Sequence, residues 1–342
     1  MQKNKITNIL LLSYRGGYGD CLLTIALIKY LLIEKNIRID IFTEPQFKIF
    51  FENLKYVNNI FLYNNPSNKS KLARYIELFK KAVLLRKTKY DIVLNNVGDF
   101  RHNFFGWLIK GKENISIHFN RHPFKNFIKP GFECLVSKYI YIPNDIINLY
   151  DIQKYIAEHI LQTKLTLPKK REKNSRTKIA IHPMAGVKCK FWEYKNWIDL
   201  IEKLYKNDKI IVFCSPNEKV EVEAAFVAVA DKVEIVAKEI QVFLKKFEKV
   251  RVFIGLDSFS IHAAYYKNVP HKIMLNGAND AKIWAPPDTK VVEVKHKCEY
   301  HPCYNKPKCL GKSFEYICIK AITVQNVLDV LDSRSVGQER FI

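Results

Sequence analysis

A glycine-rich turn with an aspartate is the first segment of the sequence able to do chemistry. In LLLSYRGGYGDCLLT, residues 10–24, Gly17 and Gly19 separate two apolar runs and Asp20 directly precedes the second. Backbone N–H groups in such a turn can approach a phosphate, and a helix N-terminus adds partial positive charge. Asp20 would repel a phosphate there, but a carboxylate at the carboxyl end of a strand suits a general base. The structural alternative for Asp20 is a helix N-cap.

The same turn matches the dinucleotide-binding fingerprint only in part. Gly17 and Gly19 fit its first two glycines, but Leu22 stands where the third belongs. No Walker-type Lys-Ser or Lys-Thr pair follows. The residues alone therefore leave phosphate binding at this turn open.

Two further loops carry charged side chains directly after apolar strands. Lys188 and Lys190 lie in IHPMAGVKCKFWEYKNW, between a strand and a helix, where lysine can bind phosphate or can simply be solvated. Glu218 follows the apolar run IIVF. The helix dipole favours an acid in that first turn, and hydrogen bonding to ribose hydroxyls is the functional alternative.

The segment FIGLDSFSIHAA brings an acid, a hydroxyl and an imidazole together. Asp257 and Ser258 follow a buried strand at the start of a helix, and His262 lies one turn later. Taken one at a time, these residues are equally typical of structural roles, in a helix that is capped at its start and whose histidine faces the core. The segment is therefore a candidate site, with a structural role as the alternative.

Four of the eight cysteines fall within 21 residues: Cys298, Cys303, Cys309 and Cys318. Their spacing does not match the two close pairs of a zinc ribbon. Disulfides are rare in the cytosol, and four thiolates suit a structural zinc or iron ion, with His296 or His301 as substitute ligands. Reduced thiols that only pack are the alternative.

The elements that position these residues alternate between strand-like and helix-like runs. A continuous apolar strand before each helix predicts α/β domains with parallel sheets covered on both faces. The charged stretch 164–178 interrupts the pattern and is typical of a linker. We therefore expect two Rossmann-like domains, residues 1–165 and 178–332.

The net charge of +22 predicts an anionic partner: nucleic acid, an anionic membrane surface or a phosphorylated substrate. No nucleic-acid-binding motif or dense basic-aromatic stripe is present, so we do not expect nucleic acid. The longest apolar stretch, 21–33, is broken by Lys29 and is shorter than a bilayer span. The first residues lack a signal-peptide pattern, so we expect a cytoplasmic protein.

Three of these segments together resemble the family-nine glycosyltransferases, the bacterial ADP-heptose:lipopolysaccharide heptosyltransferases. LLSYRGGYGDCLLTIALIKYL is similar to the family's opening turn and helix, and IHPMAGVKCKFWEYKNWIDLIEKL to its Lys-x-Trp segment. FIGLDSFSIHAAYYKNVPHKIMLNGA is similar to its Asp-Ser-Gly-x-x-His segment. A C-terminal cysteine cluster also recurs in that family, and the order matches from residue 6 to about 330.

The resemblance implies a GT-B fold, two Rossmann-like domains with parallel sheets facing a central cleft. It implies inverting transfer of heptose from ADP-heptose, held by the C-terminal domain, to a lipopolysaccharide core acceptor, held by the N-terminal domain at the inner membrane's cytosolic face. No cofactor is needed for catalysis. A four-cysteine iron centre is known in the autotransporter heptosyltransferase branch.

Carried over to this sequence, the family's motifs give roles to eight residues. The resemblance implies that Asp20 is the catalytic base, that Gly17 and Gly19 clear space for the substrates, and that Lys190 neutralises the leaving diphosphate. Glu218 would bind ribose, and the donor site would be lined by Asp257, Ser258 and His262.

One residue departs from the family's pattern, and the acceptor side is less clear. Phe259 stands where the family has a glycine close to the phosphates, so its ring would block or reshape that pocket. Arg101, His102, Arg121 and His122 are candidates to meet a phosphorylated acceptor, with a solvated face as the alternative.

Two functions from other classes compete with this interpretation. The first is a nicotinamide-dependent Rossmann oxidoreductase, against which the missing third glycine counts. The second is a non-catalytic module that binds through its basic surface and cysteine cluster.

Overall fold

The computed structural model describes residues 6–14, 16–34, 36–52, 54–64, 70–119, 133–166, 175–206, 208–295, 298–304 and 306–332. The chain divides into two compact units, Met1–Lys169 and Lys170–Ile342. The division falls inside the charged stretch 164–178, of which residues 167–174 lie outside the described residues. The expected domain bounds, 1–165 and 178–332, stay a prediction.

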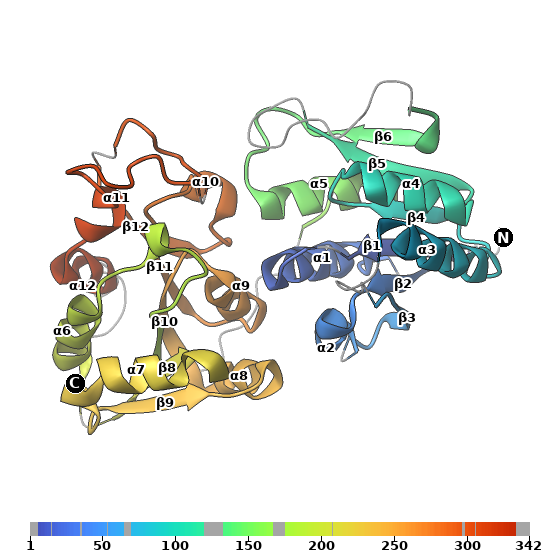
Figure 1. Ribbon diagram of the computed structural model, residues 1–342. Helices are drawn as coiled ribbons and strands as arrows, with labels where there is room; N and C mark the ends of the chain where they lie inside the picture. Colours follow the sequence, from blue (N-terminus) through green and yellow to red (C-terminus); the bar gives the residue numbers. More distant parts are fainter. Residues whose placement is uncertain are drawn as a thin grey trace. The chain divides into compact units, whose positions relative to one another are not determined.

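Unit 1 is a six-stranded sheet with helices on both faces (Figure 1). Its strand order is β3-β2-β1-β4-β5-β6, and every pairing is parallel. The described elements are β1 (Thr7–Ser13), α1 (Tyr18–Leu31), β2 (Ile37–Thr43), α2 (Lys48–Phe51), β3 (Val57–Leu62), α3 (Lys71–Arg86), β4 (Ile92–Asn95), α4 (Phe100–Ile109), β5 (Glu113–His118), β6 (Lys138–Tyr141) and α5 (Leu149–Leu161).

Alternation along β1 explains why helices cover both faces of this sheet. Leu10 and Leu12 point to one face, where they share a core with residues of α3 and α4. Ser13 points to the opposite face and hydrogen-bonds Thr24 of α1, 3.3 Å away. The apolar run of β1 is continuous because both of its faces are buried.

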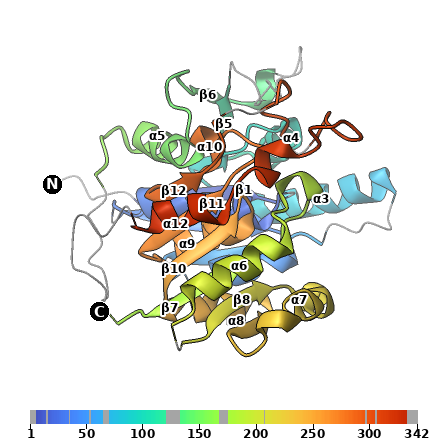
Figure 2. The same ribbon diagram turned by 90° about the vertical axis from the view of Figure 1, so that its left-hand side faces the viewer.

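Unit 2 has the same architecture, with the strand order β12-β11-β10-β7-β8-β9 and parallel pairing throughout. Figures 1 and 2 show α6 and α12 side by side on one face of this sheet and α9 on the other. The described elements are β7 (Lys178–His182), α6 (Tyr194–Leu204), β8 (Ile210–Cys214), α7 (Lys219–Ala225), β9 (Val233–Ala237), α8 (Ile240–Lys246), β10 (Val250–Leu256), α9 (Phe259–Tyr266), β11 (His271–Leu275), α10 (Ala281–Trp284), β12 (Thr289–Val292), α11 (Ile317–Lys320) and α12 (Val324–Asp332).

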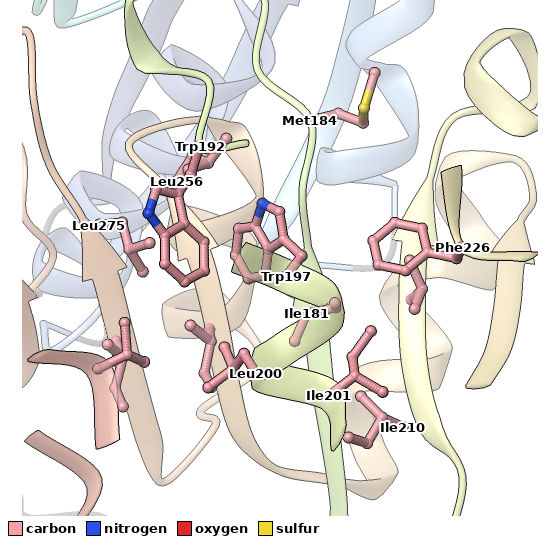
Figure 3. Close-up of a cluster of buried hydrophobic side chains, with 14 of the residues drawn as sticks. Ile181, Met184, Trp192, Trp197, Leu200, Ile201, Ile210, Phe226, Leu256 and Leu275 are labelled. Atoms are coloured by element: carbon pink, nitrogen blue, oxygen red, sulfur yellow. The ribbon is translucent and has the colours of Figure 1, made fainter. Parts of the chain in front are cut away.

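Two tryptophans anchor the core of unit 2. Trp192 and Trp197 are fully buried and meet edge to face with ring centroids 4.9 Å apart, among the aliphatic side chains drawn in Figure 3. The indole N–H of Trp192 donates to the carbonyl oxygen of Ile322 at 2.7 Å. That bond ties the C-terminal segment to the loop that carries Lys190.

Each sheet reverses its strand order at one place, between β1 and β4 in unit 1 and between β7 and β10 in unit 2. In open parallel sheets, ligands bind beyond the carboxyl ends of the strands at such a switch point. The loops to inspect therefore follow β1 and β4 in unit 1, and β7 and β10 in unit 2. Among the described residues, no helix is both long enough and apolar enough to cross a bilayer.

Candidate active site

The glycine turn of unit 1 follows β1 at its switch point and holds Asp20 at the start of α1. Gly17 is the N-cap of that helix, and its N–H donates to Asp20 Oδ2 at 2.7 Å. The alternative in which Asp20 itself is the N-cap is therefore wrong: Asp20 lies three residues into the capping box. The carboxylate is fixed by the helix start and still reaches solvent.

One glycine of this turn makes room for the carboxylate of Asp20. A Cβ on Gly16 would lie 2.8 Å from Asp20 Oδ2, so only glycine leaves the carboxylate its place. Gly17 has extended backbone angles that any residue adopts, and Gly19 lies within α1. The protein around Asp20 raises the pKa of its carboxyl by desolvation, against the bond from Gly17. A raised pKa suits a general base.

The loop after β4 adds a charged pair beside this turn. Asp99 accepts three hydrogen bonds from Arg101, from Nε at 2.8 Å, from Nη2 at 2.7 Å and from the backbone N–H at 2.8 Å. Burial tends to raise the pKa of Asp99, but His102 and Arg101 outweigh burial and hold it well below its usual range. Asp99 in turn raises the pKa of Arg101, against partial burial, with Tyr14 and Tyr75 adding to the effect.

Tyr14 joins the two loops of unit 1. His102 Nε2 lies 2.8 Å from the carbonyl oxygen of Tyr14, and the two rings are 4.2 Å apart. His102 is 2% exposed, so the interpretation of that residue as part of a solvated face is wrong. Arg101 is half-exposed at this edge, whereas Arg121 and His122 lie outside the described residues.

Asp99 is not among the predicted site residues, although the sequence holds a signal for it. Asn95, fully buried, donates to the carbonyl oxygen of Asp99 at 3.0 Å and accepts the N–H of Gly98 at 2.9 Å. Gly98 has a φ of +81°, which favours glycine. The run Asn-Asn-Val-Gly-Asp after an apolar strand is thus a shaped turn that carries a carboxylate.

In unit 2, the loops after β7 and β10 meet in an ion pair. Lys190 Nζ lies 3.0 Å from Asp257 Oδ2 and donates to the carbonyl oxygen of Asp257 at 3.0 Å. Both side chains are largely buried, 12% and 5% exposed. The structure therefore brings together two of the residues that the sequence analysis singled out, 67 positions apart.

Asparagines after β11, which are not among the predicted site residues, complete this polar cluster. Asn279 Nδ2 donates to Asp257 Oδ2 at 2.6 Å, and Asn276 Nδ2 donates to the carbonyl oxygen of Asn279 at 2.8 Å. His301 Nε2 lies 3.1 Å from that same carbonyl oxygen. The available signal is the segment Asn-Gly-Ala-Asn-Asp directly after an apolar strand.

His262 is buried beside the ion pair and 6% exposed. Burial lowers its pKa to about 4, and Lys190 adds to that shift while Asp257 opposes it. The imidazole is therefore neutral near pH 7. Ser258 is the N-cap of α9, but its side chain makes no capping bond and instead lies 3.0 Å from Ser260 Oγ.

Glu218 and Phe259 make contacts of their own in unit 2. Glu218 accepts the N–H of Ser215 at 2.8 Å in a capping box, so structure alone accounts for one of its oxygens. Desolvation lowers the pKa of His182, and the nearby Glu218 opposes the shift. The ring of Phe259 packs 5.9 Å from that of Phe243 on α8, which directs it against a neighbouring helix.

The cysteine cluster does not form the expected metal site within the described residues. There, no group of three or more histidine, cysteine, aspartate or glutamate side chains could hold a metal ion, and His296 lies outside them. Cys318 packs beside Gly277, and Cys303 lies next to Cys189. Burial, with neighbouring thiols, raises the pKa of Cys318 to about 11, so its thiol is protonated near neutral pH.

Comparison with known proteins shows the family to which this chain is related. The family model for glycosyltransferase family 9 (heptosyltransferase) matches residues 77–313. None of the curated proteins matches the chain.

Solved structures match nearly the whole chain at low sequence identity. A family 9 glycosyltransferase from Veillonella parvula is 13% identical with a TM-score of 0.74, covering 98% of this chain and 99% of its own. E. coli heptosyltransferase WaaC with ADP is 13% identical with a TM-score of 0.69, covering 96% and 98%.

A third structure is that of TibC, an iron-containing dodecameric glycosyltransferase from enterotoxigenic E. coli. TibC is 12% identical, with a TM-score of 0.54, and the match covers 98% of this chain and 82% of TibC. These likenesses confirm the GT-B-like α/β fold with two parallel six-stranded sheets. With the family model matching most of its length, the chain belongs to glycosyltransferase family 9, the heptosyltransferase family.

Proposed function

We propose that the protein transfers heptose from ADP-heptose to a lipopolysaccharide core acceptor, with inversion at the anomeric carbon. Family membership supports glycosyl transfer in place of a nicotinamide oxidoreductase or a non-catalytic binding module. The single observation that carries the site assignment is the Lys190–Asp257 pair at the switch point of unit 2, where a Rossmann-like sheet binds its ligand.

Unit 2 has the groups that a nucleotide diphosphate needs. Lys190 has one ammonium proton beyond the two that Asp257 accepts, and the N-terminal N–H groups of α9 follow Ser258. A helix N-terminus and a lysine together favour a diphosphate. Neutral His262 can hydrogen-bond without adding charge, and Glu218 would accept from ribose hydroxyls.

Unit 1 supplies the base in this proposal. The acceptor hydroxyl attacks the anomeric carbon as the bond from that carbon to the phosphate oxygen breaks, and its electrons leave with ADP. Asp20 takes the hydroxyl proton, and Lys190 balances the charge that develops on the diphosphate. Gly17 and Gly19 border the carboxylate, and no cofactor enters the reaction.

Acceptor and location are part of the proposal. Arg101, half-exposed and beside the glycine turn, would contact an anionic group of the core acceptor. Such an acceptor is carried on lipid, so the enzyme would work as a cytoplasmic protein peripheral to the inner membrane. Metal at Cys298, Cys303, Cys309 and Cys318 is not part of the proposal.

The test is calorimetric titration with ADP, GDP and UDP, followed by a transfer assay with the matching heptose donors. We expect ADP to bind at least tenfold more tightly than GDP or UDP, and NMR of the product to show the anomeric configuration opposite to that of the donor. Preference for another nucleotide would refute the donor, and retention would refute the single-displacement mechanism.

A further inference from the structure

The helix α3 of unit 1 exposes a set of large apolar side chains that the site does not use. They are between 42% and 69% exposed: Leu72, Tyr75, Ile76, Phe79, Val83 and Leu84. A surface helix normally buries its large apolar residues and exposes polar ones. Contiguous apolar surface of this kind marks a protein or membrane interaction site.

Helical spacing gathers most of these residues into one stripe. Leu72, Ile76, Phe79 and Val83 follow the i, i+4, i+7, i+11 pattern of a single helix face. The core-facing residues Leu78, Ala82 and Leu85 lie on a different face and pack with β1 and α4. We call Leu72, Tyr75, Ile76, Phe79 and Val83 the α3 stripe; it is additional to the face that stabilises the fold.

The surface continues onto α4, which lies beside α3 (Figure 1). Arg86 Nε donates to the carbonyl oxygen of Leu108 at 2.6 Å, so the last turns of the two helices adjoin. Trp107 in that turn of α4 is 45% exposed and stacks on Phe104 with centroids 6.0 Å apart. At the other end, Tyr75 lies close enough to Arg101 to act on its charge.

Basic residues accompany the stripe. Residues 72–89 contain six lysines and arginines, at positions 74, 80, 81, 86, 87 and 89, and one acid, Glu77. Lys80 and Lys87 are exposed and follow Ile76 and Val83 by four residues each, so they flank the stripe along one side. An apolar face of Leu, Ile, Phe and Tyr bordered by lysine is typical of a helix that lies in a bilayer surface.

We propose that the α3 stripe, with Trp107, docks this protein on an anionic lipid bilayer. Aromatic side chains favour the level of the lipid headgroups, and lysines beside them can extend to anionic phosphates. A second copy of the chain is the competing occupant. A symmetric contact through α3 would set the basic residues of two copies against each other, which like-charge repulsion opposes.

Docking through this surface has a consequence for the acceptor. Arg101 lies at the end of the surface marked by Tyr75 and belongs to the same turn cluster as Asp99 and Tyr14. An acceptor whose lipid stays in the bilayer would then present its anionic sugar beside Arg101. This last step rests on the proposed function, whereas the docking itself does not.

The experiment measures binding of purified full-length protein to vesicles, independently of any transfer. Vesicles of phosphatidylcholine alone are compared with vesicles containing phosphatidylglycerol and cardiolipin, by co-sedimentation at low and high salt. The variant Ile76→Glu/Phe79→Glu tests the stripe, and Lys80→Glu/Lys87→Glu tests the charge. Matched controls in unit 2 are Val227→Glu, at a 73% exposed position, and Lys203→Glu/Lys206→Glu, at two exposed lysines.

We expect the wild type to bind anionic vesicles and to lose binding in high salt. Both α3 variants should lower the partition coefficient at least tenfold, with unchanged thermal unfolding and unchanged ADP affinity, while both controls bind as the wild type does. Equal binding by the stripe variant would overturn the proposal. So would a wild-type dimer in light scattering that Ile76→Glu/Phe79→Glu converts to monomer. Vesicle binding without heptose transfer would refute only the proposed function.

Discussion

The two units share one strand order, yet their switch points hold opposite arrangements of charge. In unit 1 the glycine turn presents Asp20 to solvent on a helix start, with a raised pKa. In unit 2 the equivalent loops bury Lys190 against Asp257 and keep His262 neutral beside them. The same topology therefore holds an exposed carboxylate in one unit and a buried cation in the other, and the proposed function uses the first as base and the second for the donor.

Replacing the base should break this comparison most severely. Asp20→Asn keeps the bond from Gly17 and cannot accept the acceptor proton, so we expect turnover to fall about 100- to 10,000-fold with ADP affinity unchanged. Steady-state kinetics and calorimetry measure both quantities. Asp151→Asn, an exposed aspartate in the first turn of α5, is the matched control and should retain full turnover. Near-normal turnover by Asp20→Asn at saturating acceptor would remove Asp20 from the mechanism.

Replacing the buried Lys190 should distinguish its role from that of Lys188, the other lysine in the loop after β7. Lys190→Ala leaves Asp257 without its ion pair, and we expect a loss of about 3 kcal/mol of unfolding free energy and of about 100-fold in ADP affinity. Urea unfolding and calorimetry measure these. Lys188 is exposed, so Lys188→Ala should change neither. The double variant Lys190→Ala/Asp257→Ala should be more stable than Lys190→Ala alone; if it is not, the pair is not the stabilising interaction.

Lowering the pH should sharpen the contrast between the two units, because His262 of unit 2 then takes up a proton. Its folded pKa of about 4 lies below the ordinary 6.5, so the unfolded state binds the proton first as pH falls through this window. Stability is therefore present above pH 6.5 and is lost toward pH 4, by about 2 kcal/mol at pH 5. His262→Gln should lose about that much less than the wild type between pH 7 and pH 5 in urea unfolding. Equal losses in the two proteins would show that His262 is not the titrating group.

The smallest expected loss of turnover concerns Gly16, the glycine that lies against the carboxylate of Asp20. Gly16→Ala puts a Cβ where it would lie 2.8 Å from Asp20 Oδ2, so the carboxylate must move and its bond from Gly17 weakens. We expect about a tenfold loss of turnover, in line with a hydrogen bond to a charged group. Gly186→Ala in the β7 loop meets no atom within 4 Å and is the control. Unchanged turnover in Gly16→Ala would mean that the carboxylate has room to shift without loss.

Much of the fold could be predicted because buried parallel strands are continuous apolar runs. The strands after residue 178 follow directly from such patterns. Between residues 97 and 163 the structure has α4, β5, β6 and α5. Helix α4 buries His102, Asn103 and Gly106, so it lacks the apolar periodicity that identifies a helix. The segment from Pro45 forms only a short turn followed by the four-residue α2.

The sequence by itself determined the alternation of strands and helices, the glycine turn and the presence of Asp20 on it. These are local properties, set by side-chain polarity, backbone sterics and the start of one helix. Only the tertiary structure decided that Lys190, Asp257 and Asn279 form one cluster. It also decided that the C-terminal thiols lie near Cys318 without forming, among the described residues, a group that could hold a metal ion. The physical reason is that crossover connections bring the loops after β7, β10 and β11 to one edge of the sheet, and no local pattern encodes which side chains then meet.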